Sequence, residues 1–226
     1  MNNRTAILIF ANSAEFEASK KPFQNSTVLF KALNKETIHI VEETGIPYFL
    51  YNEKNQVGST FGERFNNAIL SVYEKGYDSV ITIGNDSPHL QSKHILKAAS
   101  QLKHDKIVLG PSKDGGFYLM GLKKKHFNST AFLKLPWQTS KLNRSISNLI
   151  HLQNIEVSYL QSLSDIDKMS DIKFVFDSKK RLSEAIKVLL KSFISIVKRV
   201  ISGLIILIET LFQTLHFNKG SPQLAS

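Results

Sequence analysis

The sequence predicts an α/β fold, a three-layer sandwich in which helices cover both faces of a mostly parallel sheet, followed by a long C-terminal amphipathic helix. Short apolar runs bounded by polar residues, such as residues 6–10, are typical of strands buried on both faces of a sheet. These runs alternate with helical periodicity, which is the pattern of parallel α/β folds. From residue 183 to residue 217 one apolar periodicity continues without a proline.

The individual elements can be assigned in chain order. A helical pattern over residues 26–43 is stopped by Gly45 and Pro47, and a strand follows at residues 48–51. The next helix should cover residues 61–75, because Thr60 and Glu63 have capping-box spacing and Gly76 follows as a C-terminal glycine. Further strands are expected at residues 80–83, 107–109, 117–122 and 155–160, with a helix from after residue 88 to about residue 102.

Composition narrows the classes of function. None of the 226 residues is a cysteine, which excludes a disulfide framework, a thiolate nucleophile and cysteine-ligated zinc or iron–sulfur sites. The net charge of +10 favours anionic partners, but without a nucleic-acid motif we expect no nucleic-acid binding. The sequence contains no P-loop, and no dinucleotide-binding glycine motif follows the first strand. These absences argue against a Walker ATPase and against a dinucleotide-binding Rossmann enzyme. No targeting segment stands out, so a cytoplasmic protein is expected.

Two polar segments follow strands at the edge of the sheet where ligands bind in open α/β folds. The segment Gly-Asn-Asp-Ser-Pro at residues 84–88 places Asp86 beyond a strand end. Its carboxylate suits Mg²⁺ or Mn²⁺, but it could equally cap the following helix. The segment Gly-Pro-Ser-Lys-Asp-Gly-Gly-Phe-Tyr at residues 110–118 lets the backbone approach a ligand at Gly115 and Gly116, or forms a hairpin turn at Asp114.

Alternate carboxylates mark a third candidate segment. Asp165 and Asp167 lie on one side of an extended chain, with Asp171 four residues on, so they could share a cation. A solvated loop explains the same pattern. The seven histidines show no metal-ligand spacing, and no nucleophile system is visible.

Taken together, these segments resemble the signatures of a bacterial family of glycosyltransferase-like proteins with the GT-A, or nucleotide-diphospho-sugar transferase, fold. That family is related to phospholactate and molybdenum-cofactor guanylyltransferases. The Phe-Gly-Glu-Arg-Phe run at residues 61–65, Trp137 with Thr139, and the late aspartates also match, in order. The resemblance covers roughly residues 5–175.

The resemblance implies a transferase that uses an activated nucleotide, either glycosyl- or nucleotidyltransferase, with an acceptor that the sequence does not identify. Asp86 and Asp167 would then bind a divalent cation, Mg²⁺ or Mn²⁺, which offsets charge on the departing diphosphate. The residues expected to bind nucleotide or substrate are Lys20, Lys21, Arg64, Gly115, Gly116 and Trp137. Asp114 is the candidate catalytic base for an inverting reaction.

One stretch departs from the family pattern. The family carries a glycine and a Lys-Thr-Arg-Leu run after the first strand, whereas residues 12–23 contain neither glycine nor arginine. Glu15 and Glu17 would repel phosphate there, and Lys20 or Lys21 would substitute as a point charge. The alternative function is therefore a degenerate, inactive transferase fold that serves as a binding or scaffold module.

The chain divides into a transferase-like part at residues 1–180, a helical appendage at 183–217 and a disordered tail at 218–226. Apolar residues of the appendage recur at the i, i+3, i+4 and i+7 spacing of one helix face. Three interpretations stay open: packing on the core, contact with a membrane surface from the cytoplasmic side, or pairing with a second copy. A membrane span is not expected, because Glu209, Gln213 and His216 interrupt the apolar stretch.

Overall fold

A computed structural model describes residues 4–21 and 23–214, and its centre is one sheet of six strands. The strands are β1 (Thr5–Phe10), β2 (Tyr48–Tyr51), β3 (Ser79–Ile83), β4 (Ile107–Pro111), β5 (Phe117–Lys123) and β6 (Val157–Tyr159). Their order across the sheet is β2-β1-β3-β5-β4-β6. Only β5 runs antiparallel to its neighbours, β3 and β4, which confirms the predicted, mostly parallel sheet.

Eight α-helices and one short 3₁₀ helix are assigned within the described residues. They are α1 (Ala14–Lys20), α2 (Ser26–Glu42), α3 (Phe61–Glu74), α4 (Ser92–Lys103), the 3₁₀ helix η1 (Lys124–His126), α5 (Ser129–Leu133), α6 (Leu142–Leu152), α7 (Met169–Asp177) and α8 (Glu184–Thr214). The predicted capping box of α3 is confirmed, because the Thr60 Oγ1 accepts from the Glu63 amide at 3.1 Å and the Glu63 carboxylate accepts from the Thr60 amide at 3.2 Å.

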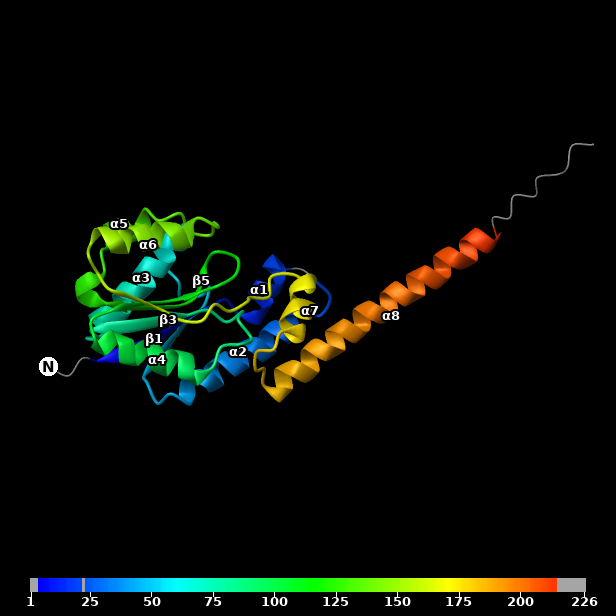
Figure 1. Ribbon diagram of the computed structural model, residues 1–226, viewed down its shortest axis with the longest axis horizontal. Coiled ribbons are helices and arrows are strands. Elements are labelled where there is room, and N and C mark those ends of the chain that lie inside the picture. The colour runs from blue at the N-terminus through cyan, green and yellow to red at the C-terminus, as the bar shows by residue number, and fades with distance from the viewer. Residues whose placement is uncertain (1–3, 22, 215–226) are drawn as a thin grey trace, which may run out of the picture.

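Helices cover both faces of the sheet, as Figure 1 shows. On one face, side chains of β1 such as Leu8 pack with Phe65 and Ile69 of α3 and with apolar residues of α5 and α6. On the other face, Ile7 and Ile9 pack against α2 and α4. Alternate residues of β1 thus enter opposite cores, which explains the continuous apolar run in its sequence.

A third core joins the first turns of α8 to α2 and α7. Ile186, Leu190 and Phe193 of α8 are buried against Leu29 and Phe30 of α2 and against apolar residues of α7. The start of the predicted appendage is therefore part of the folded domain. The rest of α8 extends away from it (Figure 1). None of the described helices is both long and apolar enough to cross a membrane. Residues 215–217 of the predicted helix and the predicted tail at 218–226 lie outside the described residues.

We expect the buried histidine of α4 to make folding sensitive to mild acid. Burial, together with nearby lysines, lowers the pKa of His94 to about 4 from an ordinary value of 6.5. Below pH 6.5 the unfolded chain binds a proton at this position that the folded chain does not bind until about pH 4. Stability should therefore fall between these two pH values and not recover below them.

Substitution of this histidine tests the effect. In His94→Gln, the loss of unfolding free energy between pH 7 and pH 5 should be roughly 1–2 kcal/mol smaller than in the wild-type chain, measured by urea unfolding. His151→Gln, at an exposed position of α6, serves as the control and should behave as wild type. Equal losses in all three proteins would contradict the assignment.

Candidate functional site

A cleft of about 1020 Å³ lies at the carboxyl ends of β1 and β3. Its walls come from α1, α3, the turn between β4 and β5, and the segment before α6. Most of the predicted site residues line this cleft: Lys20, Lys21, Arg64, Asp86, Asp114, Gly116 and Trp137. Parallel strands bring segments that are distant in sequence to one edge, which is why these residues meet.

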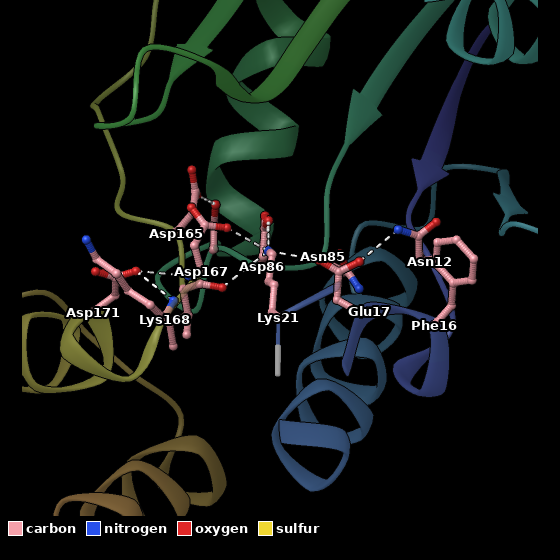
Figure 2. A network of polar contacts seen from close by, with 12 residues as sticks. Asn12, Phe16, Glu17, Lys21, Asn85, Asp86, Asp165, Asp167, Lys168 and Asp171 are labelled. Atoms are coloured by element: carbon pink, nitrogen blue, oxygen red, sulfur yellow. Dashed lines mark hydrogen bonds and ion pairs between the residues drawn. The ribbon is translucent and has the colours of Figure 1, made fainter. Parts of the chain in front are cut away.

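The ammonium of Lys21 lies at the centre of the polar network beside the cleft (Figure 2). Its Nζ is 2.8 Å from Glu17 Oε1, 3.0 Å from Asp86 Oδ2 and 2.8 Å from Asp167 Oδ1. It also donates to the carbonyl oxygen of Ile166 at 3.3 Å. Burial opposes the charged form, but the charges of Asp86 and Glu17 outweigh it and raise the pKa of Lys21 above that of an ordinary lysine. The ammonium is therefore permanent at physiological pH.

Asp86 follows β3 directly, as predicted, and its carboxylate points to Lys21 (Figure 2). The alternative role as a helix cap is wrong, because α4 begins at Ser92 with Gln91 as its N-cap. Partial burial raises the pKa of Asp86, and the charges of Glu17 and Asp167 add to that effect while Lys21 opposes it. Asp86 therefore lies in a cluster of two further carboxylates, those of Glu17 and Asp167, around one ammonium.

Asp165 belongs to the same cluster, although its role was left open by the sequence. Its carboxylate accepts a short hydrogen bond from the Ser87 hydroxyl and lines the cleft. Burial, followed by the charge of Asp86, raises its pKa to about 8.

Glu17 is the functional candidate that sequence reasoning missed. The stretch that lacks the family's glycine folds into α1, whose N-cap Ser13 accepts from the Phe16 amide. This helix turns Glu17 inward, where its other oxygen accepts from Asn12 at 2.8 Å. Glu15 lies outside and pairs with Lys31 at 2.9 Å. The helical spacing of Glu17 and Lys21, four residues apart, was the available signal.

The turn at residues 112–116 is held by Asp114. The Asp114 Oδ1 accepts from the Ser112 hydroxyl and from the Gly116 amide, the latter at 2.9 Å. Gly115 has a φ of +97°, and a Cβ there would lie 2.9 Å from the carbonyl oxygen of Ser140, so only glycine fits. Gly115 thus contacts the backbone of Ser140, whereas Gly116 faces the cleft.

Aromatic rings form the opposite wall. The Trp137 ring lies 5.6 Å from Phe61, 5.4 Å from Phe65 and 4.6 Å from Phe132, measured between ring centroids. Its indole nitrogen donates to the Phe132 carbonyl at 2.9 Å. A Cβ at Gly62 would lie 2.7 Å from the indole, so the glycine of the predicted Phe-Gly-Glu-Arg-Phe run makes room for this ring.

The remaining predicted binding residues extend from the two helices that flank the cleft. Arg64 of α3 donates to the Ser59 carbonyl at 3.3 Å. The ammonium of Lys20, the last residue of α1, lies 5.5 Å from the centre of the Phe16 ring. Both side chains line the cleft and supply positive charge at its rim.

The carboxylates of Asp86 and Asp167 fit a divalent cation by their chemistry. Both already place one oxygen on a single positive charge, that of Lys21. Within the described ranges, no group of three or more histidine, cysteine, aspartate or glutamate side chains could hold a metal ion by itself. Two carboxylates suit Mg²⁺ or Mn²⁺, which keep bound waters and take further oxygens from substrate phosphates.

Comparisons with known proteins agree with this architecture. Residues 51–139 match the model of a family described as uncharacterized proteins conserved in bacteria (DUF2064). This part holds the Phe-Gly-Glu-Arg-Phe run, both strand-end segments and Trp137. No curated protein is similar enough in sequence to count as a relative.

Among solved structures, a proposed nucleotide-diphospho-sugar transferase from Desulfovibrio desulfuricans G20 superposes with a TM-score of 0.74. It shares 20% identity over 86% of this chain and 97% of its own. Two others are more distant. The 4-diphosphocytidyl-2C-methyl-D-erythritol synthase of Anaerococcus prevotii DSM 20548 has a TM-score of 0.47 and 13% identity, over 76% of this chain and 94% of its own. A manganese complex of a Mycobacterium tuberculosis H37Rv protein has a TM-score of 0.45 and 12% identity, over 77% of this chain and 99% of its own.

The predicted resemblance is thus confirmed for the fold, through the Desulfovibrio structure, and for the central segment, through the family model. The relation to guanylyltransferases stays a prediction. The chain has the nucleotide-diphospho-sugar transferase, or GT-A, fold, and its residues 51–139 match the DUF2064 family.

Proposed function

We propose that the chain is a transferase that uses an activated nucleotide as donor and transfers either a nucleotidyl or a glycosyl group. The observation that supports it best is the meeting of Asp86 and Asp167 on one cationic centre beside a large cleft. The site lies at the carboxyl ends of the strands, where open α/β folds bind nucleotides. The fold shared with the Desulfovibrio protein is consistent with the same class of donor.

Asp86 and Asp167 would hold Mg²⁺ or Mn²⁺. When bound, the ion would offset the negative charge on the phosphates of the departing group. The side chain of Asp167 is 50% exposed and that of Asp86 is 30% exposed, so the pair is open to solvent and to a ligand. Glu17, whose side chain is 9% exposed, lies deeper and keeps Lys21 in place.

Lys20 and Lys21 would bind the donor phosphates, because both line the cleft and carry point charges suited to phosphate. Gly116 would let the backbone approach the ligand closely, and Trp137 with its neighbouring rings offers a flat apolar wall for a base or sugar. Arg64 also lines this cleft. The acceptor stays unassigned.

A specific observation favours the second candidate, a degenerate transferase fold that serves as a binding or scaffold module. The three carboxylates around Lys21 are already paired with its ammonium, so the cluster has a built-in counter-charge. A chain that never binds a divalent cation would keep this arrangement as a structural ion pair. The two candidates differ in their response to metal and nucleotide.

Nucleotide binding provides the first test. Isothermal titration with a panel of nucleoside triphosphates and nucleotide sugars plus Mn²⁺ should show at least one ligand that binds below millimolar. Asp86→Asn should weaken it about tenfold or more, because a charged metal ligand is lost. Folding stability should stay within about 1 kcal/mol, since the asparagine oxygen still accepts from Lys21.

Asp105→Asn is the matched control for that titration. Asp105 lies just before β4, at the opposite edge of the sheet, and pairs with Lys123 and Lys125. It should bind nucleotide as wild type does. If no nucleotide binds to the wild-type chain, and Asp86→Asn does not alter the titration, the transferase proposal is wrong and the second candidate, a binding or scaffold module, is favoured.

Removal of the Lys21 ammonium provides a second test. Lys21→Met leaves Glu17, Asp86 and Asp167 to repel one another, so the metal-free protein should lose about 1–3 kcal/mol of unfolding free energy. Mn²⁺ should restore much of this loss and raise the melting temperature more than in wild type. Lys31→Met, which removes an exposed lysine paired with Glu15, is the control. A Lys21→Met protein whose melting temperature falls but does not rise on addition of Mn²⁺ would count against a metal site.

The catalytic role of Asp114 can be separated from its role in the turn. In Asp114→Asn the amide oxygen can still accept from Ser112 and Gly116, so the turn and the binding of donor should persist. If Asp114 is the base, turnover of the donor identified by titration should fall by about 10²–10⁴-fold. Wild-type turnover in this variant would limit Asp114 to holding the turn.

A further inference from the structure

The outer part of α8 is an apolar surface that the domain does not cover. Figure 1 shows the helix leaving the domain as a rod beyond its first turns. Ile186, Leu190 and Phe193 are at most 2% exposed. Farther along the same helix face, Val200, Leu204 and Ile208 are 49–53% exposed. One continuous stripe therefore packs on the core at its start and faces outward afterwards.

Another side of α8 carries a line of polar, mostly basic residues. Lys187, Lys191, Lys198, Ser202 and Glu209 follow one another at spacings of four or seven residues, which aligns them along one face of a helix. All five are exposed. Lysine outnumbers the acidic residues on this line, so this face carries net positive charge.

The apolar surface of the outer part is wider than one stripe. Leu204, Ile205, Ile206, Leu207 and Ile208 are consecutive and 49–63% exposed, and five consecutive residues surround a helix completely. The stripe of Val200, Leu204 and Ile208 is the part that a single flat surface or a second helix can cover, and Ile205 and Ile206 lie beside and behind it. The charge on α8 distinguishes the two occupants, because a second copy would bring a further line of lysines, whereas anionic headgroups attract the lysines of this one.

We propose that residues 197–211 of α8 bind the surface of an anionic lipid bilayer. The helix lies along the interface, with Val200, Leu204 and Ile208 in the acyl boundary and with Lys198 and Lys191, which precedes this segment, on the headgroups. This segment is about 21 Å long, so the interaction extends well beyond a single turn. Both terms of interfacial binding are present, namely buried apolar area and attraction to negative headgroups. The cleft at the carboxyl ends of β1 and β3 is not part of this lipid-binding surface.

Flotation of the full chain with vesicles tests this directly. Vesicles of phosphatidylcholine with phosphatidylglycerol should carry the wild-type protein to the top of a density gradient. Vesicles of phosphatidylcholine alone should carry at least tenfold less, and added salt should reduce the bound fraction. Leu204→Gln with Ile208→Gln, which keeps helix propensity but removes apolar area, should lower the bound fraction at least tenfold.

Val188→Gln is the matched control, because Val188 is also an exposed apolar residue of α8 but precedes the binding segment. It should float as wild type does. Lys191→Glu with Lys198→Glu should abolish the preference for anionic vesicles. Circular dichroism confirms that each variant is folded. Absence of wild-type flotation, equal flotation of the glutamine double variant, or a lipid-free dimer that this double variant dissociates while vesicles recruit nothing would each overturn the inference.

Discussion

The largely buried ammonium of Lys21 joins three segments that are far apart in the sequence: α1, the turn after β3 and the loop before α7. Each segment contributes one carboxylate, and none of these carboxylates would be stable so close to the others without the positive charge. The floor of the cleft therefore depends on electrostatic balance more than on apolar packing. Any ligand that enters must take part in that balance, whether as a cation beside the carboxylates or as a phosphate beside the lysine.

The central strands β1, β3, β4 and β5 could be predicted well because they are buried on both faces. Such strands appear in the sequence as continuous apolar runs, and those of β1 and β3 are bounded by polar residues. The glycines were informative for a related reason. Gly115 and Gly62 lie where a Cβ would collide with the Ser140 backbone or the Trp137 ring, so their presence marks close approach and not only flexibility.

The parts that escaped prediction depend on contacts between distant residues. A helix of seven residues such as α1 is marginal on propensity alone and is stabilised here by its tertiary contacts. The resemblance implied that Asp86 and Asp167 share one site, but the insertion of Lys21 between them requires the geometry of α1. In the same way, the change of Glu17 from a residue expected to repel phosphate into a buried partner of Lys21 follows from which side of α1 faces the domain.

The packing of the first part of α8 limits how far the chain can be shortened. Ile186, Leu190 and Phe193 fill a core with Leu29 and Phe30 of α2, the helix next to α1. Full burial of an aliphatic or aromatic side chain of this kind contributes roughly 1.5–3 kcal/mol, so the three together approach the net stability of an ordinary domain. A chain that ended before α8 would therefore expose the apolar surface of α2 next to Lys21, and the cleft would lose support although no residue of α8 lines it.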